Sequence, residues 1–545
     1  MRSTFMGLET SRKGLFTQQS ALYTTGHNIS NANTIGYSRQ RVNMQATAGF
    51  PTAGLNSPTF PGHLGTGVEA GSIQRIRDSF IDRQYRQETT KLGYWESRSQ
   101  SISQMEDILN EPSDYGLAKS LNEFWGSLQD LSTNPESGAA RSVVVQRGIA
   151  VADSFNYMYN SIKQIQDNAG NEIAVTLKDV NSILRQIASI NEQIQAVEPN
   201  GYIPNDLYDA RDVLLDELST HFPIEIENVK SGGNALASAE GSITVSLKLN
   251  GSTVKLVDGK EFAQLRTDGT SNPDNITPSG TIQGFYIVKL KADGSDEYLS
   301  NDWQSNTKTP INISEFTGIG KLRSLVDAYG YGPENNKKGL FPEMLDKLDA
   351  MAKAFAEEFN KIHKGDEDPN HPDYPQGSDI NGKRGEEFFV PKEGTGITAA
   401  NISVSAAIIS DPGKIVASDS KPVQQGTQGP EGTPEPGNGK FALKLATMKF
   451  KQLSSLDGVS VQSYFEGIIG QLGVDGEQAE RLTNNTAILQ QAVSERRAAV
   501  SSVSLDEEMT NMITFQQAYN ANARMITVID EMLEKIINGL GRVGL

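Results

Sequence analysis

The chain contains no cysteine, which excludes disulfide bonds, thiolate nucleophiles and thiolate metal sites. Only 7% of its 545 residues are aromatic, whereas 51 are glycine. No segment approaches the roughly 18 consecutive apolar residues of a membrane-spanning helix, and residues 1–34 lack the apolar run of a signal peptide. The length suits three or four domains. The absences predict stabilisation by packing, no membrane anchor, and export, if any, without a cleaved signal.

Positive charge is also scarce, with 49 Lys and Arg against 67 Asp and Glu and a net charge of -18. Nucleic-acid binding depends on neutralising phosphates, so this balance argues against a nucleic-acid partner. The two ends differ in sign, because residues 1–41 hold five basic residues and one acidic residue, whereas residues 505–545 hold six acidic and three basic residues. Opposite signs favour pairing of the ends, although exposed charges contribute little each.

Patterns typical of catalytic or ligand sites are weak. The five histidines form no His-Glu-x-x-His pair. Residues 539–544 match the glycine fingerprint of dinucleotide-binding folds by spelling, but the fingerprint follows a helical pattern and no helix can follow it. We therefore predict that the protein is not an enzyme and has no catalytic residues, no cofactor and no metal site.

Apolar residues recur every seven positions at both ends of the chain. The N-terminal column is Leu8, Leu15, Leu22 and Ile29, and the C-terminal column is Met512, Tyr519, Ile526, Leu533 and Leu540. This spacing keeps side chains along one edge of a helix. We predict that both ends are helices and that these columns form an assembly interface.

Neither terminal helix is predicted to be stable alone. Burying four Leu-sized side chains contributes roughly 1.5 to 3 kcal/mol each, whereas ordering about 30 backbone residues costs roughly 1 to 2 kcal/mol apiece. Isolated helices are marginal in water. We expect ends that are disordered in the lone chain and helical in an assembly. The alternative is a pair of amphipathic helices docked on their own domain.

The middle of the chain alternates between helical and strand patterns. A short strand is predicted at 68–73, and helices are predicted from about 76 to 109 and from 117 to 131. The longest helical pattern, 138–197, would span about 90 Å and carries a coiled-coil seam in its second half. A further helix is predicted to begin at Asn205 or Asp206 and to end before Pro223.

The remaining segments complete a nested arrangement. Period-two alternation with Asn-Gly and Asp-Gly turns predicts a β domain at 224–319. Helix returns at 340–363 and from about 441 to 500, and Ser504 and Glu507 have the spacing of a capping box. The predicted fold is mainly α with a β insertion, elongated and multi-domain. Its units are a terminal helical domain of 1–45 plus 504–545, a stem of 46–223, 320–364 and 440–503, a β domain of 224–319, and an irregular insert of 365–439.

Two short motifs flank this arrangement. Residues 28–41 read NISNANTIGYSRQR and residues 515–524 read FQQAYNANAR. Asn and Gly tolerate left-handed geometry, so they suit the end of a helix, and alanines permit close approach of helices. The motif positions that we single out are Asn31, Asn33, Gly36, Tyr37, Arg39 and Gln40, and then Phe515, Gln516, Gln517, Ala518 and Tyr519.

Both motifs resemble the signatures of bacterial flagellar axial proteins. Within that family the chain resembles the proteins of the hook-filament junction, through the segments 37–40, 65–86, 205–218 and 504–508. Hook and distal-rod proteins share the end motifs but resemble a β-rich body without the helix at 138–197. Flagellin and the third hook-associated protein have long helices but lack the motifs in this form. A secreted adhesin or enzyme on a coiled-coil stem is the alternative from another class.

The resemblance implies a mechanical function. It implies export as an unfolded chain through the flagellar type III channel, with a dedicated chaperone bound to the C-terminal region beforehand. It further implies a ring-like layer of copies of this chain at the hook-filament junction of the bacterial flagellum, outside the cell. The hook protein would lie below that layer and the third hook-associated protein above it.

Overall fold

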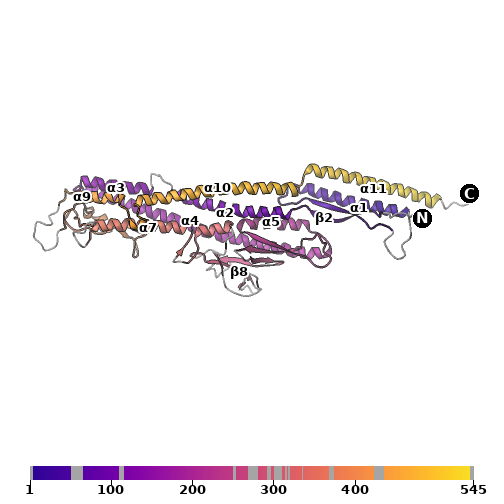
Figure 1. Cartoon of the computed structure of the whole chain (residues 1–545), viewed down its shortest axis with the longest axis horizontal. Helices are drawn as coiled ribbons and strands as arrows, with labels where there is room; N and C mark the ends of the chain where they lie inside the picture. Colours follow the sequence, from indigo (N-terminus) through magenta and orange to yellow (C-terminus); the bar gives the residue numbers. More distant parts are fainter. Residues whose placement is uncertain are drawn as a thin grey trace.

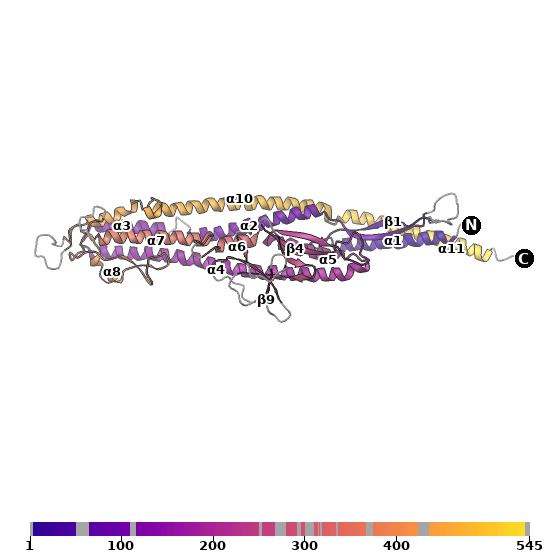
Figure 2. The same cartoon turned by 60° about the horizontal axis from the view of Figure 1, so that its bottom comes forward.

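The computed structural model is a long rod with both ends of the chain at one tip (Figure 1). It describes residues 4–50, 65–109, 116–249, 253–267, 280–290, 296–299, 303, 310–313, 316, 319–333, 336–366, 374–422 and 435–539. Long helices run along the rod, and β1 lies with α1 and α11 at the tip that carries the termini, apart from β4 and β9 in the middle of the rod (Figure 2). The predicted fold class, an elongated, mainly α protein with a β insertion, is confirmed.

The tip that carries both termini is a thin unit, which we call the terminal arm. It contains helices α1 (Thr4–Ser30) and α11 (Leu505–Gly539) and the antiparallel strands β1 (Gln40–Ala46) and β2 (Val68–Arg75). Each terminal helix finds its partner in the other end of the same chain. The expectation of disordered ends compared the free energy of apolar burial with the cost of ordering the backbone for each helix alone. It did not include the packing of the two helices on each other.

The rest of the rod, the stem, is a bundle of helices around one continuous apolar core. Its helices are α2 (Ser79–Leu109), α3 (Leu117–Thr133), α4 (Gly138–Val197), α5 (Asn205–His221), α6 (Lys321–Tyr329), α7 (Leu340–Lys364), α8 (Ala406–Ser410), α9 (Lys440–Thr447) and α10 (Val461–Ser501). Short 3-10 turns lie at Glu198–Asn200, Pro412–Lys414, Met448–Phe450 and Ser454–Leu456. The predicted 60-residue helix is confirmed as α4.

Helix α4 begins where the sequence provides a cap and is buried along much of its length. The Ser137 side chain accepts a hydrogen bond from the Ala140 amide at 3.2 Å, which satisfies one of the free amides at the helix start. The predicted seam lies inward, since Val180, Ile183, Ile187 and Ile194 are all buried. Their partners are the β insert and neighbouring stem helices of the same subunit.

The β insert consists of two four-stranded sheets packed on α4. One sheet contains β3 (Ile224–Val229), β4 (Ser242–Lys248), β5 (Thr253–Asp258) and β6 (Glu261–Phe262), and the other contains β7 (Gln264–Thr267), β8 (Gly284–Leu290), β9 (Asp296–Tyr298) and β10 (Ile311–Asn312). Two buried amides of α4 tie the sheets to the stem. Asn191 donates to the Ile243 carbonyl at 3.0 Å, and Asn181 donates to the Leu265 carbonyl at 3.0 Å.

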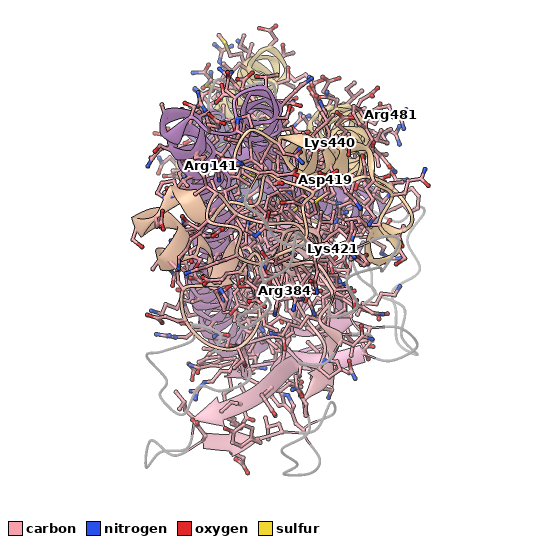
Figure 3. The ribbon with its side chains drawn as sticks, turned by 90° about the vertical axis from the view of Figure 1, so that its left-hand side faces the viewer. Arg141, Arg384, Asp419, Lys421, Lys440 and Arg481 are labelled. Atoms are coloured by element: carbon pink, nitrogen blue, oxygen red, sulfur yellow. The ribbon has the colours of Figure 1, made fainter. Side chains whose placement is uncertain are left out.

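The second insert is held against the far end of the stem by buried polar groups. It contains β11 (Phe389–Pro391) and β12 (Ile402–Val404). Arg141 of α4 donates to the carbonyls of Pro135 and Ile415, at 2.9 and 2.6 Å. Seen from that end, Arg141 lies among the stem helices beside the insert (Figure 3).

A buried histidine completes this attachment. His363 of α7 lies with Nδ1 2.7 Å from the Glu386 carbonyl, and its Nε2 accepts from the Val416 amide at 3.0 Å. Only the neutral ring can make both bonds. Burial lowers the pKa of His363 to about 4, against the bond to Glu386, which raises it.

This arrangement predicts a loss of stability in mild acid. The unfolded histidine titrates near pH 6.5, so His363 binds one proton in the unfolded chain that it does not bind in the folded chain as the pH falls from 6.5 to about 4. The linked loss is about 3 kcal/mol by the end of that window. We expect His363→Gln to flatten the dependence of the urea-unfolding free energy on pH between these values. Equal slopes in the two proteins would contradict the assignment.

Candidate functional site

The two terminal helices pack antiparallel in a constant register. Gly7 faces Ile529, Gly14 faces Asn522, and Asn28 faces Glu508. The packing is close, because a Cβ atom on Gly14 would lie 2.9 Å from the Asn522 Oδ1 atom. The opposite charges of the two ends are therefore brought together in one unit, as the sequence predicted.

The predicted apolar columns lie along this pair but are not deeply buried. Leu8, Leu15, Leu22, Ile29, Met512, Tyr519, Ile526 and Leu533 are each half-buried, and Leu540 lies outside the described residues. A pair of helices with a β ribbon on one side is too thin to enclose these side chains fully. The columns therefore keep partly accessible apolar surface, and their role in assembly stays a prediction.

The most deeply buried positions of α1 are small or polar, and the heptad pattern does not include them. They are Ser11, Thr17, Ala21, Thr24, Thr25 and Asn28. The Thr17 hydroxyl donates to the Val68 carbonyl at 3.1 Å, which joins α1 to β2. Small side chains at steps of three and four could have indicated this second face, but a search for apolar heptads does not record them.

The C-terminal motif divides between the inner and outer faces of α11. Phe515 is half-buried and lines a cavity of about 400 Å³ with Ala21 and Val42. Ala518 and Tyr519 are also half-buried, whereas Gln516 and Gln517 are exposed. The motif therefore supplies contacts within the arm and leaves polar groups on its surface.

Helix α1 ends within the N-terminal motif, and the turn that follows packs against α5 of the stem. The Asn31 side chain donates to the His27 carbonyl at 3.1 Å, while Asn33 is exposed. Gly36 has a φ of 80°, and a Cβ atom at this position would overlap a methyl group of Val213 on α5. Glycine is required there by both the backbone conformation and the close approach.

A buried asparagine just before this turn organises the motif. Asn28 is 1% exposed, and its Oδ1 accepts from the Gln40 amide at 2.9 Å and from the Tyr37 hydroxyl at 2.8 Å. Its Nδ2 donates to the Gln40 carbonyl at 2.8 Å and to Glu508 Oε2 at 3.0 Å. All four hydrogen-bonding positions of the amide are used, so Asn28 joins α1, β1 and α11.

Arg39 fastens the start of α11 to the same turn. Its Nε and Nη1 donate to Glu508 at 2.7 Å and to Glu507 at 2.6 Å, and its backbone amide donates to the Ser501 carbonyl at 2.9 Å. The spacing in the sequence predicts a capping role for Glu507 towards Ser504. In the structure this carboxylate pairs with Arg39 instead. Arg39 is far from Glu507 in the sequence, so local spacing does not predict the pair.

The motif also reaches the stem through carboxylates of α5. Gln40 Nε2 donates to Asp206 at 2.9 Å, and the Ser38 amide and hydroxyl donate to Asp209 at 2.9 and 2.6 Å. Burial raises the pKa of Tyr37 far above its usual value, and the nearby carboxylates of Asp206, Asp209 and Glu508 raise it further. Tyr37 thus remains a neutral hydrogen-bond donor.

The described part of the chain was compared with the requirements of a metal site and of a membrane span. There, no group of three or more His, Asp or Glu side chains is arranged to hold a metal ion. None of the helices searched combines the length and apolar character needed to cross a bilayer. The features that stand out are the arm, its motifs and its attachment to the stem.

Known protein families match both the stem and the arm. The model of the flagellar hook-associated protein FlgK helical domain matches residues 102–389, more than half of the chain. The C-terminal model of flagellar basal body rod FlgEFG proteins matches residues 497–539, which include α11. The chain is 40% identical to flagellar hook-associated protein 1 of Bacillus subtilis, over 99% of each chain. The chain belongs to the flagellar hook-associated protein 1 family.

More distant relatives of this family agree. Flagellar hook-associated protein 1 of Escherichia coli is 25% identical over 97% of this chain and 99% of its own length. The solved structure of the flagellar hook junction protein FlgK from Burkholderia pseudomallei matches with a TM-score of 0.55 at 15% identity, over 77% of this chain and 100% of that one. The solved structure supports the fold, and the sequence matches decide between the axial proteins that the motifs alone left open.

The Asn28 network gives the first prediction for the arm. Asn28→Ala would leave the buried Gln40 amide without its acceptor, which costs roughly 1 to 3 kcal/mol. We expect hydrogen exchange of the Gln40 amide to accelerate about ten- to hundredfold. Exchange measured by mass spectrometry on peptides from β1 would show this.

The matched control for this experiment lies five residues further on. Asn33→Ala removes the same amide from an exposed position of the same motif, and we expect no change in β1. Equal exchange in the two variants would show that Asn28 does not hold the arm together.

Proposed function

We propose that the chain is a structural junction protein that joins the flagellar hook to the filament. Copies of it form a ring-like layer by contacts between their terminal arms, and the protein has no enzymatic role. Membership of the flagellar hook-associated protein 1 family supports this function. The observation that carries the assembly step is the concentration of exposed apolar side chains on the arm.

One flank of α11 bears an apolar row, here called the outer row, that stays exposed in the described structure. Met525, Val528, Met532 and Ile536 follow one another at steps of three and four and are 41 to 51% exposed. They lie beside the face that holds Ile526 and Ile529 against α1, since Met525 and Met532 are one turn on either side of Ile529 and Ile536 is two turns beyond it. A contiguous apolar row of this kind marks an interaction surface.

Helix α1 carries a matching outer row of aromatic residues. Phe5, Phe16 and Tyr23 are 57 to 73% exposed and lie opposite its buried face. Helix α1 carries basic side chains at Arg12 and Lys13. The C-terminal half of α11 carries acidic side chains at Asp530, Glu531 and Glu534. We propose that α11 of one copy packs on α1 of the next. Such a contact joins two different surfaces, so it repeats head to tail into a closed ring or helical layer.

The same proposal names the other partners and the location. The chain is exported unfolded through the flagellar type III channel after an export chaperone has bound its C-terminal region. The hook protein lies below the layer and the third hook-associated protein above it, at the hook-filament junction outside the cell. Residues 1–45 and 504–545 form the assembly domain, and the stem, the β domain of 224–319 and the insert of 365–439 lie around it.

A deletion strain tests this function directly. Cells without the chain are expected to build hooks but to release filament subunits into the medium, because the filament has no layer on which to grow. Electron microscopy of the cell surface and assay of the medium measure the two outcomes. Normal filaments on such cells would overturn the proposal.

Two variants of α11 separate packing within the arm from packing between copies. Met532→Asp places a charge on the outer row, so we expect a normally folded monomer that fails to attach at the hook tip. Ile526→Asp places the charge on the inner face, so the monomer's arm should also become sensitive to protease. Met532→Asp removes apolar burial from the contact between copies, and Ile526→Asp removes it from the packing within the arm. The lost burial is worth about 1.5 to 3 kcal/mol in each contact, and the cost of burying a carboxylate adds to it.

Asn520→Asp is the matched control, because it adds the same charge at an exposed polar position of α11. Cells with this variant should swim as wild type does. Normal motility with Met532→Asp would show that the outer row is not the contact between copies.

A further inference from the structure

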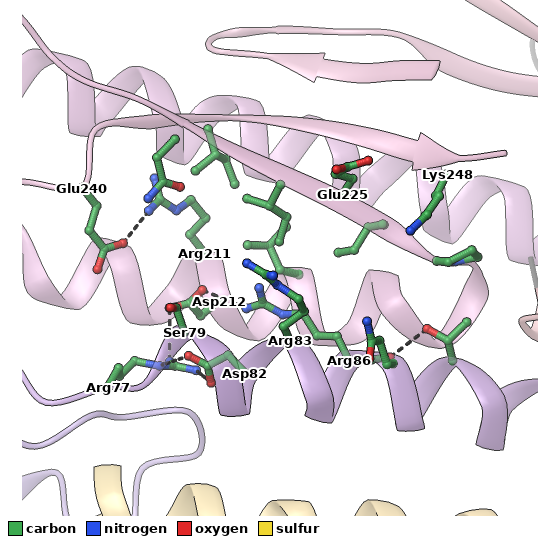
Figure 4. Close-up of a pocket in the computed structure, with 18 of the residues that line it drawn as sticks. Arg77, Ser79, Asp82, Arg83, Arg86, Arg211, Asp212, Glu225, Glu240 and Lys248 are labelled. Atoms are coloured by element: carbon green, nitrogen blue, oxygen red, sulfur yellow. Dashed lines mark hydrogen bonds and ion pairs between the residues drawn. The ribbon is translucent and has the colours of Figure 1, made fainter. Parts of the chain in front are cut away.

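The terminal arm is joined to the stem by charged and polar groups. Among the described residues, the continuous apolar core of the stem includes none from α1, β1, β2 or α11. The chain passes between arm and stem at two places, the segment at 75–78 and the link at 502–504. The turn at 36–39, within the arm, also contacts the stem. One buried cluster of arginine and aspartate side chains joins the segment at 75–78, this turn and the last turns of α10, and Figure 4 shows the part of it around Asp212.

Asp212 of α5 is the centre of this cluster. Its carboxylate lies 2.6 Å from Arg75 at the end of β2, 3.1 Å from Arg77, and 2.9 Å from Arg86 of α2. The three guanidinium groups hold the pKa of Asp212 well below its ordinary value, even though burial alone would raise it. Segments from the arm, from α2 and from α5 therefore meet on one carboxylate.

The surrounding carboxylates extend the cluster to the turn at 36–39 and to the end of α10. Asp209 accepts from Arg75 at 2.9 Å and also binds Ser38 of that turn. Near the end of α10, Arg497 lies 3.0 Å from Asp82 and 2.7 Å from Asp216. The same guanidinium stacks on Tyr85 at 4.6 Å. The last turns of α10, just before the link into α11, are thereby fixed to α2 and α5.

Buried ion pairs define geometry more strongly than they add stability, because their attraction is offset by the loss of hydration. A guanidinium accepts few orientations of a carboxylate, so several such pairs on one centre permit a single arrangement. Neutralising that centre takes from all three guanidinium groups the carboxylate that they share. Each keeps carboxylates of its own, which are Asp209 and Glu240 for Arg75, Asp82 for Arg77 and Asp216 for Arg86, but no anion then holds the three groups at one point. An apolar joint, in contrast, could slide with little change in energy.

We propose that this cluster is an electrostatic latch that fixes the tilt of the terminal arm relative to the stem, and that neutralising Asp212 frees the arm as a unit while the arm and the stem stay folded. The latch is a property of the single chain and does not depend on the proposed ring. It sets the direction in which the stem leaves the arm in every copy.

Distance measurements between spin labels test the latch in the full-length chain. The absence of native cysteine permits labels at Asn484→Cys on α10 and Gln517→Cys on α11, both exposed positions. We expect one narrow distance distribution in the otherwise wild-type chain and loss of that narrow peak with Asp212→Asn. Circular dichroism should show unchanged helix content.

Further variants keep the outcome decisive. Asp153→Asn, an exposed position on α4, should leave the distribution narrow. If Asp212→Asn lowers the helix content, Arg75→Gln removes the contact from the arm's side and is expected to broaden the same distribution. A narrow distribution in a folded latch variant, or a broad one without any latch variant, would overturn the proposal.

Discussion

The apolar core of the stem is the interaction on which the rest of the molecule depends, including the antiparallel pairing of α1 with α11. These helices are separated by more than four hundred residues of chain, and two free ends that far apart rarely meet. The stem removes this obstacle, because α10 packs against α2 and the Arg39 amide, in the turn before β1, hydrogen-bonds to Ser501 at the end of α10. Each terminal helix then needs only to add turns along a partner that is already in place. The order of dependence runs from stem to joint to arm.

Stem and arm are stabilised in different ways, and this difference relates to function. The stem buries a cluster of aromatic rings, with Phe124 and Phe359 5.4 Å apart and Phe388 and Phe389 4.9 Å apart. The arm is two helices with a ribbon and cannot enclose its apolar residues, so Phe16 and Met532 remain exposed. A thick unit encloses its apolar residues, whereas a thin unit leaves apolar surface accessible, and this is the surface that the proposed layer of copies would use. Because the joint between them is polar, the apolar packing of the stem and that of the arm are separate among the described residues.

Local sequence patterns were reliable where one element buries one face. The three-and-four spacing through Val180 and Ile194 identified α4, and the predicted bounds of 138–197 agree with the structure. The patterns were less informative about the arm. Heptad columns marked Leu8 to Ile29 as the interface, yet Asn28 and Thr17 lie deeper. A polar residue becomes buried only when distant groups meet its hydrogen-bonding needs, and periodicity contains no information about those groups.

The sequence by itself determined the class of protein, the helical rod, the β insert and the two ends that belong together, because these follow from periodicity, composition and short motifs within a few turns of chain. Tertiary structure alone decided that Glu508 binds Asn28 and Arg39, that Gly36 lies against Val213, and that Asp212 gathers three arginines. Those contacts join residues more than a hundred positions apart. Charge and hydrogen bonding act over a few ångströms, so only the folded path of the chain selects which polar groups become partners.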